Sequence, residues 1–200
     1  MRARMFAVCA AVACSIVVIA AQETKKAPLA QGKEKPASAK AGQMTDEEMI
    51  KSAMSAAPAA VARNATIVAM GAGIKMRTLR SGTNGFTCMP DNPETPGPDP
   101  TCADQNAMAW LDAYLNKKDP PKDKVGIAYM LAGGTDASNT DPYATAPTAT
   151  NHWIKTGRHV MVVGAKGLIE GYPRAANPIT SSPYVMWAGT PYEHLMLPVK

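Results

Sequence analysis

Two of the three histidines in the chain stand two residues before a methionine, in runs typical of β-strands. These His-x-Met motifs occupy residues 159–161 and 194–196. In a strand, residues i and i+2 point to the same side of the sheet, so each motif presents an imidazole and a thioether together. This soft ligand pair suits copper. If the two strands were neighbours, four side chains could converge on one ion: His159, Met161, His194 and Met196.

A structural role is the alternative interpretation of both motifs. The chain has 13 methionines, so a methionine two places from a histidine is not rare. Met161 and Met196 could fill gaps in a core, and the histidines could be buried with hydrogen-bond partners. Further soft groups that could lie nearby are Met76, Met130, Met186 and the ring of Trp187.

The first 21 residues predict a secretory signal peptide. Arg2 and Arg4 precede an apolar run over residues 5–19, and the small residues Ala20 and Ala21 follow. This order is typical of a cleaved signal. The run is about 15 residues long, whereas a membrane span needs about 20, so an uncleaved anchor is the weaker alternative. We therefore expect a periplasmic or secreted protein with no transmembrane segment after cleavage.

The net charge of +5 lies outside the predicted folded domain. Residues 22–44 contain five lysines and two glutamates, are rich in Ala and Pro, and lack aromatics, which predicts a disordered tail. Residues 45–200 carry equal numbers of basic and acidic residues and are expected to form one globular domain. Without a basic stripe, nucleic-acid binding is not expected.

Cys88 and Cys102 are the only cysteines beyond the predicted signal peptide. In an exported protein, two remaining cysteines most often form a disulfide. The bridge would close a loop of about 15 residues and stabilise the fold by about 3 kcal/mol. The chain has no C-x-x-C motif, and the spacing does not fit a zinc site.

The apolar periodicity predicts an α+β fold. A capping box at Thr45 and Glu48 predicts the start of a first helix that ends near Ser55. Apolar residues that recur every three to four positions predict a second helix over 103–117 with one apolar face. Strands are expected over 66–70, 74–79, 86–89, 125–131, 159–163, 184–187 and 194–199. We expect a mostly antiparallel sheet of about six or seven short strands, two helices and long Pro/Gly loops.

Two other kinds of site remain open. A calcium ion could bind the oxygen donors of Asp136, Ser138, Asn139 and Asp141, although such residues are ordinary turn formers. An aromatic-lined pocket of a hydrolase or carbohydrate-binding domain could use Trp153, Trp187, Tyr143 and Tyr192. The chain contains no G-x-S-x-G, H-E-x-x-H or P-loop motif, which favours a non-enzymatic protein without deciding the question.

Several strings together resemble a family of exported bacterial proteins of unknown function, over roughly residues 60–199. The strings lie at 79–91, 99–102, 129–134, 138–145, 159–161 and 184–199. The resemblance implies one exported domain and a Gram-negative or similar source, and it supplies no activity, cofactor or catalytic residue. The leading hypothesis is thus a non-enzymatic exported binding or structural domain. Copper binding and the aromatic pocket are its alternatives, and the ligand is left open.

Overall fold

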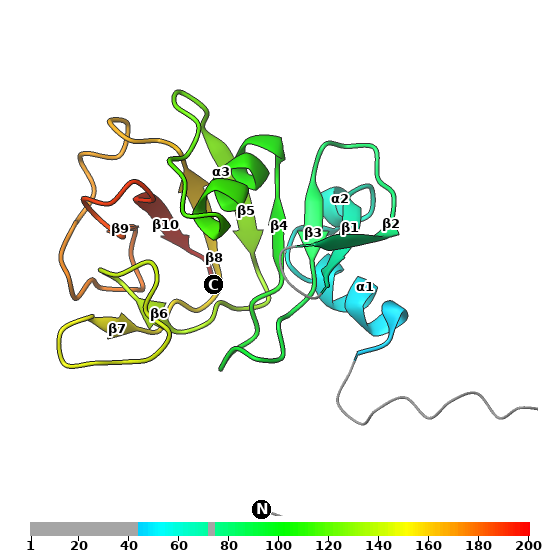
Figure 1. Cartoon of the computed structure of the whole chain (residues 1–200), viewed down its shortest axis with the longest axis horizontal. Coiled ribbons are helices and arrows are strands. Elements are labelled where there is room, and N and C mark those ends of the chain that lie inside the picture. The colour runs from blue at the N-terminus through cyan, green and yellow to red at the C-terminus, as the bar shows by residue number, and fades with distance from the viewer. Residues whose placement is uncertain (1–43, 72–74) are drawn as a thin grey trace, which may run out of the picture. The chain divides into compact units, whose positions relative to one another are not determined.

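The computed structural model describes residues 44–71 and 75–200, which form an α+β fold (Figure 1). The predicted signal peptide (1–21) and nearly all of the predicted tail (22–44) lie outside these ranges. Residues 72–74, which include the start of the strand expected over 74–79, also lie outside these ranges. The described residues belong to one compact unit.

Three helices occur in the described ranges. They are α1 (Asp46–Met54), α2 (Ala59–Ala62) and α3 (Gln105–Leu115). The first begins as predicted: Thr45 accepts a hydrogen bond from the Glu48 backbone N–H, and the Glu48 carboxylate accepts one from the Thr45 N–H. None of the helices in this part of the chain has the length and apolarity that a membrane span requires.

Eight strands form one sheet in the order β2-β1-β3-β4-β5-β8-β10-β9, and two short strands form a separate ribbon, β6-β7. The bounds are β1 Thr66–Met70, β2 Met76–Arg80, β3 Thr87–Met89, β4 Thr101–Ala103, β5 Gly126–Met130, β6 Ala137–Ser138, β7 Trp153–Ile154, β8 His159–Val163, β9 Tyr184–Met186 and β10 His194–Pro198. Every neighbouring pair is antiparallel except β1 with β3. The predicted class is therefore confirmed.

The numbers of elements differ from the sequence-based expectation of six or seven strands and two helices. The helix α2 and the strands β4, β6 and β7 were not predicted. Each has only two to four residues, too few for an apolar period to emerge. Residues 165–183 contain turns and bends but no helix or strand.

The two faces of the large sheet are covered by different helices. In β4, Cys102 packs with residues of α1 and α2, while the next residue, Ala103, packs with α3. Successive strand residues point to opposite faces, so α3 and the α1–α2 pair lie on opposite sides. The helix α3 runs along β5 and β4 (Figure 1). Val163 of β8 packs in the same cluster as α3, which places the His-x-Met side chains on the α3 face.

The close packing of α3 on β5 depends on Gly126. A Cβ atom at this position would lie 2.7 Å from the Cα atom of Ala107 in α3. Such a contact is far inside van der Waals distance, so only glycine lets the helix backbone approach the strand this closely. The approach brings the α3 side chains directly over the sheet.

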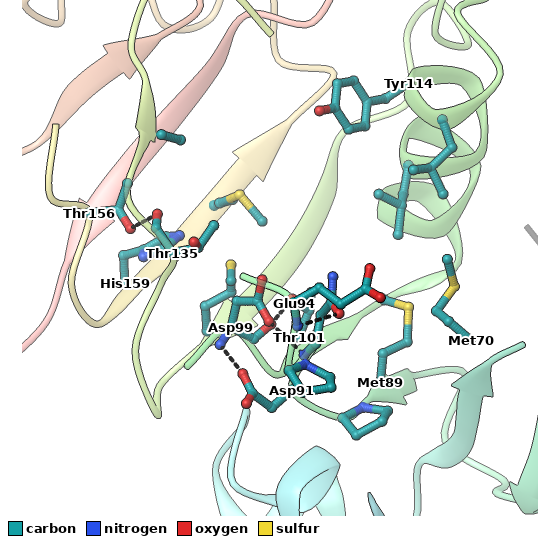
Figure 2. A pocket seen from close by; sticks show the side chains of 18 of the residues that line it. Met70, Met89, Asp91, Glu94, Asp99, Thr101, Tyr114, Thr135, Thr156 and His159 are labelled. Carbon is teal, nitrogen blue, oxygen red and sulfur yellow. Dashed lines mark hydrogen bonds between the residues drawn. The ribbon is translucent and has the colours of Figure 1, made fainter. Parts of the chain in front are cut away.

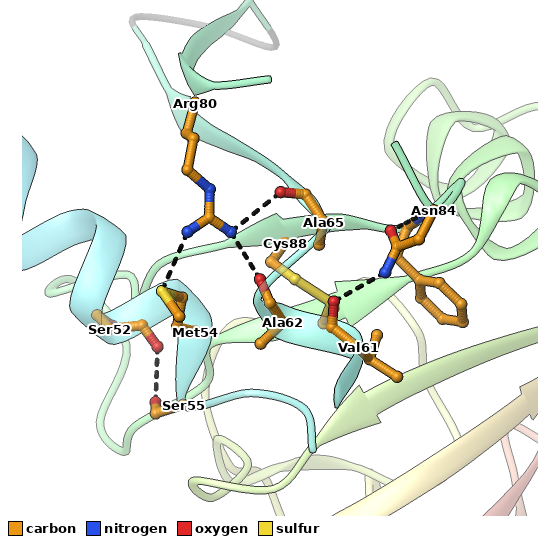
Figure 3. Close-up of a disulfide and its surroundings, with 11 residues drawn as sticks. Ser52, Met54, Ser55, Val61, Ala62, Ala65, Arg80, Asn84 and Cys88 are labelled. Atoms are coloured by element: carbon orange, nitrogen blue, oxygen red, sulfur yellow. Dashed lines mark hydrogen bonds between the residues drawn. A yellow bond between two sulfur atoms is a disulfide. The ribbon is translucent and has the colours of Figure 1, made fainter. Parts of the chain in front are cut away.

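The disulfide joins Cys88 to Cys102, as predicted. The two residues are direct partners on the neighbouring strands β3 and β4, and both are fully buried. The guanidinium of Arg80 lies nearby and donates to the carbonyl oxygens of Ala62 and Ala65 (Figure 3). The bridge therefore anchors the sheet beneath α1 and α2, on the face opposite α3.

Candidate functional site

The two His-x-Met strands, β8 and β10, are neighbours in the sheet. They pair antiparallel, and the register places Met161 directly opposite Met196. His159 lies two positions to one side of this methionine pair, and His194 lies two positions to the other side. Within each strand the histidine and the methionine are two residues apart, and the two methionines are direct cross-strand partners. All four side chains therefore lie on one face of the sheet.

The antiparallel register gives the four side chains an approximate local two-fold arrangement. The methionine pair lies at its centre, and one histidine flanks it on each strand. Along the strands the two histidine Cα atoms are separated by about 13 Å, at about 3.3 Å per residue. The two imidazoles therefore lie at opposite ends of this arrangement, with the two thioethers between them. All four side chains line a single cavity of about 970 Å³.

Backbone carbonyls set the tautomer of both histidines. The Nδ1 atom of His159 lies 2.8 Å from the Gly157 oxygen, and that of His194 lies 2.9 Å from the Tyr192 oxygen. A carbonyl oxygen only accepts, so each Nδ1 carries the proton and donates it. In the neutral ring, Nε2 then holds the free lone pair. Metal-bound histidines are usually oriented by such a hydrogen bond from the other ring nitrogen.

Burial keeps both imidazoles neutral. The His159 ring is almost fully buried, which lowers its pKa below the ordinary value. Burial lowers the pKa of His194 to about 4, and the charge of His159 lowers it further. At neutral pH both side chains are expected to be uncharged.

These pKa values predict that the metal-free protein loses stability in mild acid. The unfolded chain takes up a proton at His194 near pH 6.5, whereas the folded chain does so only near pH 4. Between these values the unfolded state binds more protons than the folded state. The free energy of unfolding therefore decreases as the pH is lowered, by about 3 kcal/mol between neutral pH and pH 4 from this residue alone. Urea unfolding at several pH values with a metal chelator present measures the loss.

The variant His194→Gln, which cannot titrate, serves as the comparison. Its free energy of unfolding should change less between pH 6.5 and pH 5 than that of the wild type. His152→Ala should retain the wild-type slope, because this histidine lies away from the cavity and contacts Asn177. A wild-type curve that is flat over this interval would contradict the prediction.

Two of the further soft groups considered from the sequence lie directly beside the histidines. Met130 of β5 is the cross-strand partner of His159, and Met186 of β9 is the partner of His194. Both methionines line the same cavity. Met76 does not, since it is exposed on the edge strand β2.

Two tryptophan rings form an aromatic wall around His194. The centroid of the His194 ring lies 5.4 Å from the ring centroid of Trp110 and 5.0 Å from that of Trp187, and both contacts are edge-on. Trp187 has a φ of 56°, which is unusual for a bulky residue. Its indole N–H donates to the Ser138 carbonyl at 2.8 Å, and its backbone N–H donates to the Asn139 carbonyl at 2.9 Å. These bonds hold the strained residue in place, as is common at functional sites.

A glycine lets the loop after β5 close over the other end of the cavity. A Cβ atom at Gly134 would lie 2.7 Å from the His159 Cε1 atom, so a larger residue would displace the ring. The hydroxyl of Thr156 donates to the Thr135 carbonyl beside it (Figure 2). The hydroxyl of Thr135 and the indole N–H of Trp110 are buried without a hydrogen-bond partner at the cavity wall. Both could donate to acceptor atoms of a bound molecule.

The four residues of the predicted aromatic pocket do not form one cavity lining. Only Trp187 lines the large cavity. Tyr143 is exposed and stacks on Tyr114, whereas Tyr192 is buried. Trp153 belongs to the small ribbon, in β7. The aromatic groups that do line the cavity with Trp187 are Trp110 and Tyr114, which both lie in the predicted second helix.

Two of the four oxygen donors considered for calcium, those of Ser138 and Asp141, are engaged in turns, and the side-chain oxygen of Asn139 is buried without a hydrogen-bond partner. The Ser138 hydroxyl accepts a hydrogen bond from the backbone N–H of Asp141. The Asp141 carboxylate accepts one from the backbone N–H of Tyr143. Within residues 44–71 and 75–200, no three His, Cys, Asp or Glu side chains gather as a metal-binding group. A site of two imidazoles and two thioethers contains only two side chains of these four types, because methionine is not one of them.

No protein-family model matches the chain, and no curated protein or solved structure does so either. The resemblance to a family of exported bacterial proteins therefore stays a prediction.

Proposed function

We propose that this chain is an exported, non-enzymatic protein that binds copper(I). The ligands are His159 and Met161 of β8 with His194 and Met196 of β10. Export is supported by the signal-like residues 1–21 and by the disulfide, which is typical of oxidising compartments.

The observation that carries the proposal is the in-register pairing of Met161 with Met196. A shift by one residue would turn one of the two motifs to the opposite face of the sheet. The actual register instead gathers two thioethers and two imidazoles on one cavity wall. The carbonyl bonds to Nδ1 leave each Nε2 atom available as a ligand.

The donor set favours copper(I) over other biological metals. Thioethers are soft ligands that select copper(I), whereas calcium and magnesium prefer oxygen donors. All four ligands are neutral at pH 7, and the site is buried among apolar and aromatic groups. A low-dielectric cavity of this kind disfavours high charge, so a monovalent ion fits it better than a divalent one.

Anaerobic titration of the protein with copper(I) against a chromogenic chelator tests the proposal. We expect one ion per chain and a dissociation constant below about 1 µM. X-ray absorption at the copper edge should show both nitrogen and sulfur ligands. Zinc, titrated in the same way, should bind at least about a hundredfold more weakly, since it does not share the preference for thioethers. Affinity for copper(I) weaker than micromolar would exclude the site.

A further inference from the structure

Methionines from six strands of the large sheet line the same cavity. They are Met70 (β1), Met89 (β3), Met130 (β5), Met161 (β8), Met196 (β10) and Met186 (β9). The two leucines that line the cavity, Leu111 and Leu115, belong to α3, so the apolar groups that the sheet contributes to it are mainly thioethers. The row extends well beyond the four ligands proposed above, so most of its members have no role in that site.

The strand register makes the row nearly continuous. Met89 pairs with Thr101 of β4, whose neighbour on the other side is β5 with Met130. Met130 in turn pairs with His159. Neighbouring strands are about 4.8 Å apart, so successive soft donors are separated by one or two strand spacings. The long, flexible methionine side chain can span such gaps.

Exposure changes along the row from one end to the other. Met70 is 47% exposed and pairs with Met76 of β2, which is 39% exposed. Met89 and Met130 are 7% and 9% exposed, and Met196 at the copper site is 1% exposed. The thioethers therefore lead from the solvent at the β1–β2 edge to the buried histidines.

Acidic side chains accompany the outer part of the row. Asp91, Glu94 and Asp99 line the cavity beside Met89, at the point where β3 ends and β4 begins (Figure 2). Arg77 lines the same region, and its charge is balanced by a two-point ion pair with Asp46. The carboxylates attract a cation toward the outer thioethers.

We propose that this row is the loading route of the copper site: a soft monovalent cation binds first at Met70 and Met89 and passes through Met130 to the buried ligands. The inference rests on the copper site proposed above. Each transfer exchanges one thioether ligand for the next, and the charge of the ion does not change. Outer residues then control how fast the ion arrives, while the final ligands control how tightly it is held.

Loading kinetics separate these two roles. Trp110 and Trp187 lie beside His194 and report arrival of the ion through their fluorescence. In anaerobic stopped-flow mixing with chelated copper(I), Met70→Leu/Met89→Leu should load at least about tenfold more slowly than the wild type. Its equilibrium affinity should stay within about twofold, because a route changes forward and reverse rates equally. The swap conserves volume, so the fold should persist.

Met54→Leu is the matched control, since Met54 packs against the opposite face with α1 and does not line the cavity. It should load at the wild-type rate. An unchanged rate in Met70→Leu/Met89→Leu would overturn the loading route while leaving the copper site intact. Failure of the copper site itself would appear instead as absent binding in the equilibrium titration of the wild type.

A second measurement tests the outer thioethers without the buried histidines. Silver(I), a soft monovalent ion, is added to the variant His159→Ala/His194→Ala carrying ¹³C-methyl methionine. The methyl resonances of Met70 and Met89 should shift, and those of Met54 should not. If the methyl resonances of Met70 and Met89 stay in place, these side chains do not bind the ion and the route is wrong.

Discussion

Replacing His159 and His194 together by alanine is expected to lower the affinity for copper(I) by at least about a hundredfold. The change removes both nitrogen ligands, whereas loss of a group that merely orients a ligand already costs about 10- to 100-fold. Competition with a chromogenic copper(I) chelator under anaerobic conditions measures the effect. His152→Ala is the matched control and should bind as the wild type does, because His152 lies outside the cavity wall.

Both histidines are buried, so their removal also perturbs packing. The variant Met161→Leu/Met196→Leu avoids this problem, since such a volume-conserving exchange usually costs less than about 1.5 kcal/mol. It should weaken copper(I) binding at least about tenfold with little change in the melting temperature of the metal-free protein. If either double variant retains affinity within about threefold of the wild type, the four side chains are not the ligands.

Loss of the disulfide through Cys88→Ala/Cys102→Ala is expected to lower the free energy of unfolding by about 3 kcal/mol. The bridge closes a loop with a sequence separation of 14, and its loss lets the unfolded chain gain entropy. Both sulfur atoms are also fully buried against α1 and α2, so alanine removes packing there. Urea unfolding of the oxidised wild type and the variant measures the difference.

Copper(I) binding at the proposed site supplies an internal control for this variant. The disulfide lies on the face of the sheet opposite the cavity, so the folded variant should bind copper(I) within about twofold of the wild type. Reduction should destabilise the wild type by a similar amount and leave the variant unchanged. A variant as stable as the oxidised wild type, within about 0.5 kcal/mol, would show that the bridge contributes little.

Local patterns in the sequence were sufficient for the elements that carry the site. The capping box at Thr45 predicted the start of α1, and the apolar spacing around Trp110 predicted α3. The runs at 159–163 and 194–199 predicted β8 and β10 almost to their ends. These signals are local because helix caps and side-chain periodicity depend only on nearby residues. Short elements such as β4 and β6 carry no such signal.

The residues proposed as ligands were also visible in the sequence, because residue type and i, i+2 spacing define what one strand presents. The spacing of His159 and Met161 predicts that an imidazole and a thioether lie on the same face of a strand. The same reasoning applies to His194 and Met196. Neither motif indicates which strand lies beside it in the sheet.

Strand order and register were decided only by the tertiary structure. They depend on contacts between residues far apart in the chain, such as Met161 with Met196 and Met130 with His159. The same is true of Trp110, which reaches His194 only because Gly126 lets α3 pack closely on β5. Local spacing thus determined which donors each strand offers. Packing of the whole sheet, driven by burial of both faces, decided that they meet in one cavity.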